Sequence, residues 1–269
     1  MLPPKQALVQ RKDKLFVRNV IDIIESAAPL KWQEEWDNSG LQVGNRNAEV
    51  KNVLLTTDVT ESVVSEAITR GCEMIVSHHP LLFHGLKHIC GETPQERCVE
   101  TAIRHNIAVY SAHTSMDSWL HGVSGRMAEQ IGIKKYSLLQ TKDEEHGLGV
   151  IGELDEAIPY ETLLAKVKSA FEAPALRYIP AVKSNVKLIA LCGGAGAEFV
   201  EEAIKQGADV FITADVKYHT FLDVNGRIGI IDLDHWISEH FVRDVFRELL
   251  QGKVNTLIAT EDYSPVKIY

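Results

Sequence analysis

Two stretches of this chain repeat one pattern: an apolar strand, an amphipathic helix, a glycine and a second apolar strand. Residues 53–79 read VLLTTDVTESVVSEAITRGCEMIVSHH, and residues 188–215 read LIALCGGAGAEFVEEAIKQGADVFITAD. A helix that connects two strands in this way returns the chain to its starting direction, so the strands pair in parallel. The repeat therefore predicts a duplicated α/β unit, in which equivalent strands carry equivalent positions.

Polar residues follow the second strand of each repeat. In the first repeat the strand ends at Ser77 and is followed by His78 and His79, and Pro80 is expected to stop it because proline lacks a backbone donor. In the second repeat the matching position is Asp215. Ligand sites in parallel α/β sheets lie at the carboxyl ends of strands, so we expect these side chains to lie at such an edge.

A second pair of matching sites lies one strand further along the chain. An apolar run at residues 107–110 leads to His113-x-x-x-Asp117, and another at residues 228–233 leads to His235-x-x-x-Glu239. A spacing of four residues places two side chains on one face of a helix, one turn apart. An imidazole and a carboxylate placed in this way can bind one divalent cation.

If the two halves face each other, His78, His79 and Asp117 meet His235 and Glu239. This set of nitrogen and oxygen ligands without a thiolate suits zinc, iron, manganese or cobalt. A bridging carboxylate can hold two ions roughly 3.5–4 Å apart. The alternative interpretation is that the histidines are incidental and that Glu239 is a solvated helix residue paired with Arg243.

The remaining pattern gives the element boundaries. Helices are expected at residues 15–28, 93–105, 161–171 and from 117 or 119 to 131, with Asp58 or Thr60 capping the helix of the first repeat. Short strands are expected at residues 148–153 and 176–179, and the polar stretch 134–145 is interpreted as a linker or an edge. The predicted division is a first α/β half at residues 1–134 and a second at residues 135–269, with residues 1–13 as a loose lead-in.

Two loops allow two interpretations each. Residues 32–44, WQEEWDNSGLQVG, are interpreted as a turn with two packed tryptophans in preference to a polar loop that lines a pocket. The glycine-rich turn at residues 192–196 is interpreted as a tight turn, and phosphate binding by its backbone N–H groups is the less favoured alternative.

Composition excludes several classes of protein. The net charge of −9 argues against nucleic acid as a main partner, because phosphate binding needs a basic face. No apolar run reaches the length of a membrane span, and no secretory segment is recognised at the start. The four cysteines have no CxxC spacing, so we expect free thiols in a reducing, cytoplasmic compartment.

The motifs WDNSGLQVG, SHHPLLF, AHTSMD, GGAG, ADVKYH and IDLDHWISE occur in this order, and together they resemble the NGG-interacting-factor-three-like family. Members of this family are also catalogued as GTP cyclohydrolase I type 2 homologues. The resemblance implies an α/β fold of two intertwined halves with mixed sheets in layers, two divalent metal ions in a dinuclear centre, and a toroidal homohexamer. It places the metal ligands on His78, His79, Asp117, His235 and Glu239, with Glu239 as the bridging ligand.

Two residues depart from the family pattern. Asp234 stands where glycine is usual, and Ala214 stands where glycine is common. Neither change removes a ligand, but Asp234 adds negative charge near the predicted site and can alter the backbone there.

Two functions fit these predictions. The first is a metal-dependent hydrolase that acts on a nucleotide-like or phosphoester small molecule, with His113 orienting a ligand or moving a proton and the catalytic residues otherwise unknown. The second is a non-catalytic metal-binding ring that serves as a metal store, a chaperone or an interaction scaffold.

Overall fold

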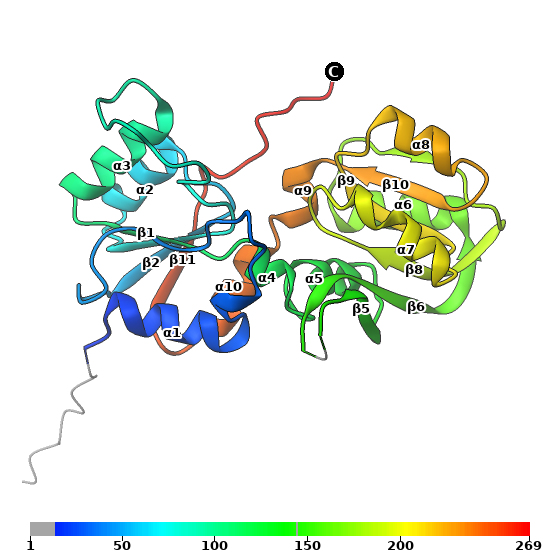
Figure 1. Cartoon of the computed structure of the whole chain (residues 1–269), viewed down its shortest axis with the longest axis horizontal. Coiled ribbons are helices and arrows are strands. Elements are labelled where there is room, and N and C mark those ends of the chain that lie inside the picture. The colour runs from blue at the N-terminus through cyan, green and yellow to red at the C-terminus, as the bar shows by residue number, and fades with distance from the viewer. Residues whose placement is uncertain (1–13, 144) are drawn as a thin grey trace, which may run out of the picture.

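A computed structural model describes residues 14–143 and 145–269, and it contains two sheets in two lobes (Figure 1). The first sheet has the strand order β1-β4-β3-β2-β11, and the second has the order β5-β6-β8-β9-β10-β7. Each sheet mixes a parallel centre with antiparallel neighbours: β1 is antiparallel to β4, and β6 and β7 are antiparallel to β8 and β10. The α/β class and the mixed sheets are confirmed. The predicted lead-in at residues 1–13 lies outside the described residues.

Helices cover both faces of the first sheet. Its strands are β1 (Gly40–Val43), β2 (Asn52–Thr56), β3 (Met74–Ser77), β4 (Ala108–Ser111) and β11 (Asn255–Ile258). One face packs on α1 (Val17–Ala27) and α10 (Val242–Leu250), and the other on α2 (Glu61–Thr69) and α3 (Pro94–Arg104). Adjacent residues of β2 show why both faces need cover, because Val53 and Leu55 face one layer while Leu54 faces the other.

The second lobe has the same three layers. Its strands are β5 (Tyr136–Thr141), β6 (Gly147–Pro159), β7 (Arg177–Ile179), β8 (Asn185–Leu191), β9 (Val210–Ala214) and β10 (Gly229–Leu233). One face packs on α5 (Val123–Gln130) and α6 (Tyr160–Ala170), and the other on α7 (Val200–Lys205) and α8 (Tyr218–Val224). The first repeat thus becomes β2-α2-β3, and the second becomes β8-α7-β9.

The chain returns to the first sheet at its end. After β10, the short helix α9 (His235–Glu239) leads into α10, and β11 then pairs in parallel with β2. Figure 1 shows α10 and β11 in the lobe built by the first part of the chain. Residues 242–258 therefore lie in the first lobe, although they belong to the predicted second half.

The helix expected from residue 117 or 119 to 131 ends near the expected residue but begins later, at Val123. Two helices are present, α4 (Thr114–Asp117) and α5, with Gly122 in the turn between them. A Cβ at Gly122 would lie 1.9 Å from the carbonyl oxygen of Met116, so only glycine allows the chain to pass this close. Asp117 consequently ends a short helix that begins just after His113. The stretch 134–145, interpreted as a linker or an edge, contains the edge strand β5.

Among the described residues, no helix combines the length and apolarity that crossing a bilayer demands. The four cysteines are free thiols, and three of them are buried.

One buried carboxylate joins three segments near the lobe junction. Asp262 accepts hydrogen bonds from the backbone N–H of Thr57 (2.6 Å), the indole N–H of Trp236 (2.9 Å) and the guanidinium of Arg243 (3.2 Å). These partners follow β2, lie in α9 and lie in α10. Asp262 therefore fixes the first sheet to the helix that carries His235 and Glu239.

Replacing Asp262 with alanine should destabilise the protein by about 2–4 kcal/mol, because it removes the carboxylate partner of Arg243, whose side chain is only 13% exposed, and leaves the donors of Thr57 and Trp236 without their acceptor. Urea unfolding measures this change. Asp155→Ala is the matched control, since Asp155 pairs with Lys134 on the surface with both side chains 75% exposed, and it should change the free energy of unfolding by less than about 1 kcal/mol. Equal effects of the two substitutions would contradict the role of Asp262.

Candidate metal centre

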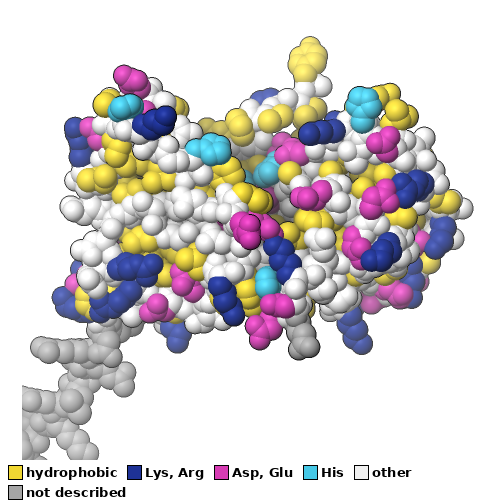
Figure 2. Space-filling model, viewed as in Figure 1, with side chains coloured by type: hydrophobic (Ala, Val, Ile, Leu, Met, Phe, Trp, Pro, Cys, Tyr) yellow, Lys and Arg dark blue, Asp and Glu magenta, His cyan; other side chains and the backbone are white. Residues whose placement is uncertain are grey.

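The carboxyl ends of the strands from both sheets meet at the junction of the lobes. His78 and His79 follow β3, Asp117 ends the helix after β4, and His235 and Glu239 begin and end α9 after β10. Figure 2 shows acidic and histidine side chains gathered in the hollow between the lobes. The structure thus brings together the five residues that the duplication selected.

Each histidine at the junction is held through Nδ1. The Nδ1 atom of His78 lies 3.0 Å from the carbonyl oxygen of Ala112, that of His79 lies 2.8 Å from Asp58, and that of His235 lies 2.7 Å from Asp215. A carbonyl oxygen can only accept, so Nδ1 of His78 carries the proton, and its Nε2 is then free to bind a cation. This is the usual arrangement around metal-binding histidines, in which an outer acceptor fixes the ring and its tautomer.

Asp215 is held in a strained backbone conformation. Its φ of +54° lies in the left-handed region, which costs a residue other than glycine about 1–3 kcal/mol and is concentrated at functional sites. In this conformation the carboxylate of Asp215 faces Nδ1 of His235, just as the carboxylate of Asp58 faces Nδ1 of His79. The sequence identified Asp215 as the match of the His79 position, but it gave Asp58 only a capping role, and Thr60 is the cap of α2.

Glu239 lies between the ring of His78 on one side and the rings of His79 and His235 on the other. Its Oε2 atom is 2.9 Å from Nε2 of His79 and 3.1 Å from Nε2 of His235, while its Oε1 atom is 3.7 Å from Nε2 of His78. Nε2 of His78 is also 3.6 Å from Oδ1 of Asp117. Two atoms in this set, Nε2 of His78 and Oδ1 of Asp117, are buried and have no hydrogen-bond partner.

These unpartnered atoms fit a cation site. Two ligand atoms bound to one tetrahedral zinc ion at about 2.0–2.1 Å lie roughly 3.3 Å from each other. The separations on both sides of Glu239 lie near this value, and burial of unsatisfied polar atoms is otherwise costly. His79, His235 and Glu239 form one cluster of candidate ligand atoms, and His78, His79 and His113 form a second.

The charges at the site depend on each other. Burial opposes charge on His79 and His235, but nearby carboxylates outweigh it, so the pKa of His79 lies well above its ordinary value and that of His235 rises to about 9. Burial also acts to raise the pKa of Glu239, yet His78, His235 and His79 hold it well below the ordinary value. Burial raises the pKa of Asp117 to about 7. Without a metal, protonated imidazoles provide the positive charge that balances the buried carboxylate.

The glycine-rich turn after β8 makes room for Glu239. A Cβ at Gly194 would lie 2.1 Å from Oε1 of Glu239, and Gly194 has a φ of +62°. Its N–H group donates to Ser238 at 2.9 Å, and that of Gly196 donates to Thr213 at 3.0 Å. Because these backbone donors are already bonded, the tight-turn interpretation agrees with the structure and the phosphate alternative does not.

Asp234 has a local structural role. It is the N-cap of α9, and its side chain accepts a hydrogen bond from the backbone N–H of Ile237 at 3.3 Å. The residue that departs from the family pattern thus fixes the first turn of the helix that carries His235 and Glu239. The alternative in which Glu239 is solvated and paired with Arg243 is wrong, since Glu239 is buried and Arg243 pairs with Asp262.

The loop at residues 32–44 contributes to the site, which the favoured interpretation missed. Trp32 is buried and stacks on His146, but Trp36 is 61% exposed and lines a cavity beside the cluster. The side chain of Asp37 is fully buried, and its Oδ1 atom lies 2.8 Å from Nδ1 of His113. The turn-forming residues after Trp36 gave no signal that Asp37 pairs with His113, because the two residues are 76 positions apart in the sequence.

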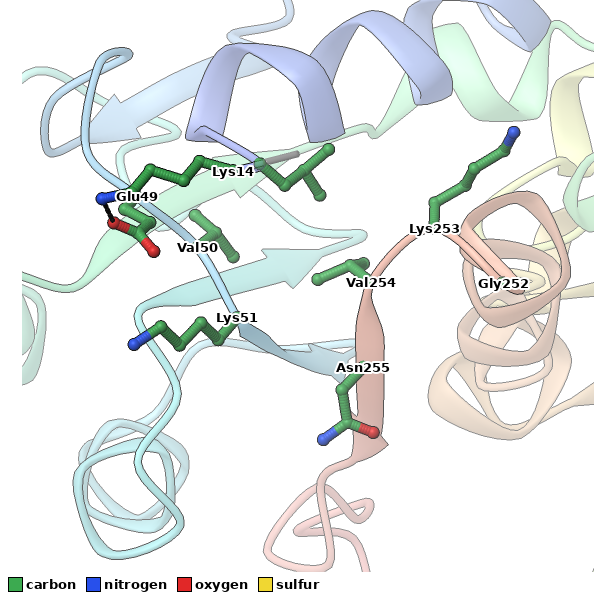
Figure 3. A pocket seen from close by; sticks show the side chains of 9 residues that line it. Lys14, Glu49, Val50, Lys51, Gly252, Lys253, Val254 and Asn255 are labelled. Atoms are coloured by element: carbon green, nitrogen blue, oxygen red, sulfur yellow. Dashed lines mark hydrogen bonds and ion pairs between the residues drawn. The ribbon is translucent and has the colours of Figure 1, made fainter. Parts of the chain in front are cut away.

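A cavity of about 370 Å³ opens onto the cluster, within the range of small-molecule sites. Its lining includes His113, Asp117, His235 and Glu239. The cavity in Figure 3 lies at the opposite edge of the first sheet, where β2 and β11 begin, and its lining includes Lys14, Glu49, Lys51, Lys253 and Asn255. Glu49, the acidic residue in that lining, pairs with Lys14 at 2.8 Å, so this second cavity offers no comparable ligand set among the described residues.

The histidines of the first half do not all converge. His84, His88, His105 and His121 lie outside both clusters of candidate ligands, whereas His78, His79 and His113 lie within them. Only some of the histidines in this part of the sequence therefore take part in the candidate site.

Comparison with known proteins identifies the family of this chain. Residues 15–264 match the model of the Duf34/NIF3 (NGG1p interacting factor 3) family, and the chain belongs to this family. It is 35% identical over 247 residues to a GTP cyclohydrolase 1 type 2 homolog of Clostridium acetobutylicum, covering 90% of this chain and 92% of the relative. A protein of the same name from Streptococcus pneumoniae is 32% identical over 245 residues, covering 89% of this chain and 92% of the relative.

Solved structures share the fold. A Staphylococcus aureus hypothetical protein superposes with a TM-score of 0.87 at 26% identity, covering 96% of this chain and all of the other. A Bacillus cereus protein related to NIF3 gives 0.85 at 23% identity, covering 95% and 99%. The expected family and fold are therefore confirmed.

Gly194→Ala should release metal because the added methyl group displaces Glu239. Gly207→Ala is the matched control: Gly207 also has a positive φ, +79°, but a Cβ there would meet nothing within 4 Å. Both substitutions should cost roughly 1–2 kcal/mol of stability from the backbone, while only Gly194→Ala loses zinc. Elemental analysis with urea unfolding tests this, and full zinc content in Gly194→Ala would refute the close approach.

Proposed function

We propose that the protein binds two divalent metal ions at the junction of its lobes and acts as a hydrolase on a nucleotide-like or phosphoester small molecule. The observation that carries this proposal is the convergence of three imidazole Nε2 atoms on both oxygens of the buried Glu239 carboxylate, beside an open cavity. The names of the similar bacterial proteins, GTP cyclohydrolase 1 type 2 homologs, support a nucleotide-like substrate.

The proposed ligands divide into two groups. His78 and Asp117 would hold one ion with Oε1 of Glu239, and His79 and His235 would hold the other with Oε2. Zinc, iron, manganese and cobalt all accept such nitrogen and oxygen ligands. Two ions held in this way supply Lewis-acid activation of a water molecule and of a substrate oxygen.

His113 is the proposed proton carrier. Asp37 holds its Nδ1 atom at 2.8 Å, and Asp37 is itself fixed by the hydroxyl groups of Ser39 (2.7 Å) and Thr114 (2.5 Å). With Nδ1 engaged, the ring presents Nε2 for proton exchange with a bound substrate. The cavity that reaches His113 favours this function over a closed, purely storage site.

Glu239→Gln should lose metal from both positions, and Asp117→Asn should lose mainly one ion. The reason is that Glu239 has an oxygen in each group, whereas Asp117 faces only His78. Metal analysis after reconstitution with zinc measures the ratio of metal to protein. Glu198→Gln is the matched control, because Glu198 lines the same cavity outside both ligand clusters.

Turnover separates the enzyme from a metal-binding scaffold. The metal-loaded protein should hydrolyse at least one member of a panel containing GTP, a phosphomonoester and a phosphodiester, and Glu239→Gln should reduce that rate at least 100-fold. Metal binding without turnover on the panel, together with fully closed coordination, would favour the scaffold.

We further propose that the chain assembles into a ring-shaped homohexamer and takes a small molecule in preference to nucleic acid. Exposed apolar side chains such as Tyr178, Tyr218 and Leu222 supply contact surface that a lone subunit leaves in water. Light scattering at micromolar concentration should give six times the chain mass of 30.0 kDa. A mass of one chain would exclude the ring.

A further inference from the structure

We propose that Trp36 and Phe83 form a stacking face for a planar heteroaromatic ring of the substrate, beside the candidate metal centre. This inference rests on the proposed hydrolase function, because it concerns the same cavity. It names the part of the substrate that the metal ligands do not recognise.

The two rings lie together at the cavity. Trp36 is 61% exposed and Phe83 is 40% exposed, and their centroids are 5.9 Å apart at an interplanar angle of 61°. Both also meet the ring of His113, at 6.0 Å for Trp36 and 6.1 Å for Phe83. The exposed aromatic surface is thus continuous with the residue that we propose to carry the proton.

The loops that carry the two rings are bonded to each other. The side-chain amide of Asn38 donates to the carbonyl oxygen of Leu82 at 2.6 Å, and the N–H of Leu82 donates to Gln42 at 3.1 Å. Each loop therefore holds the other next to its aromatic residue, Trp36 in one and Phe83 in the other. A face that is fixed before binding loses little conformational entropy when a ligand arrives, so it suits recognition.

The rest of the cavity suits a ring that carries polar edges. Leu148 and Phe199 add apolar surface, and Gln140 of β5 adds an amide that can both donate and accept hydrogen bonds. Lys142 is already paired with Glu34, which leaves less positive charge for a bare anion. Aromatic side chains bind flat π-systems by stacking, so a heteroaromatic ring such as a nucleobase fits this lining best.

Binding of simple probes to the zinc-loaded and the zinc-free protein tests the proposal. Guanosine and adenosine carry the ring without a phosphate, ribose 5-phosphate carries the phosphate without the ring, and choline tests for a cation held by the aromatic faces. Titration calorimetry and tryptophan fluorescence should show at least one nucleoside binding about tenfold or more tightly than the other two probes. A preference for ribose 5-phosphate or choline would overturn the proposal, as would binding of neither nucleoside.

Substitutions then locate the binding face. Trp36→Leu and Phe83→Leu should each weaken nucleoside binding about tenfold while the zinc content stays at that of the parent. Tyr263→Leu is the matched control, since Tyr263 is 57% exposed and lies outside this cavity, and it should bind the nucleoside as the parent does. Unchanged nucleoside affinity in both Trp36→Leu and Phe83→Leu would overturn the stacking face.

The two proposals fail in different ways. If the protein binds no zinc but Trp36→Leu still weakens nucleoside binding, the metal-dependent function is wrong and the stacking face is right. If zinc binds and nucleosides do not, the stacking face is wrong and the metal centre remains.

Discussion

One buried carboxylate, that of Glu239, lies where the two lobes join, and nearly every feature of that junction helps to position it. A carboxylate in this environment is costly unless positive charge lies nearby, and the raised pKa values of His79 and His235, which follow strands of different sheets, supply that charge. The turn at Gly194 leaves space for its oxygen, Asp234 caps the helix that carries it, and Asp262 ties that helix to the first sheet. Since each support comes from a different segment, the site forms only when both lobes are folded and joined.

Two of the candidate ligands are held in the same way, although the repeat matches Asp215 with His79 and not with Asp58. In each half a histidine that points to Glu239 is held by an aspartate through Nδ1, Asp58 for His79 and Asp215 for His235. The halves differ where the site needs asymmetry. The shorter Asp117 faces only His78, while the longer Glu239 reaches His78 with one oxygen and His79 with the other, as the proposed shared carboxylate requires.

Much of the fold, and the convergence of the five candidate residues, could be predicted because the signals for both are local in the sequence. Strand ends that carry histidine are visible in the sequence, and a spacing of four residues reports a shared helix face. The pairing of β11 with β2 could not be predicted, because a four-residue strand joins a sheet begun about 200 positions earlier and leaves no periodic signal. The roles of Asp37 and Asp58 were missed for a similar reason: each carboxylate follows ordinary turn or capping chemistry in the sequence, and only the tertiary fold brings it to a histidine.

The most direct test of the account is the position of bound metal in a crystal of the zinc-loaded protein, located by anomalous scattering. The account predicts two peaks roughly 3.5–4 Å apart, one beside His78 and Asp117 and one beside His79 and His235, with an oxygen of Glu239 bound to each. A single peak, or two peaks with Glu239 bound to neither, would contradict the shared carboxylate on which the proposed function rests.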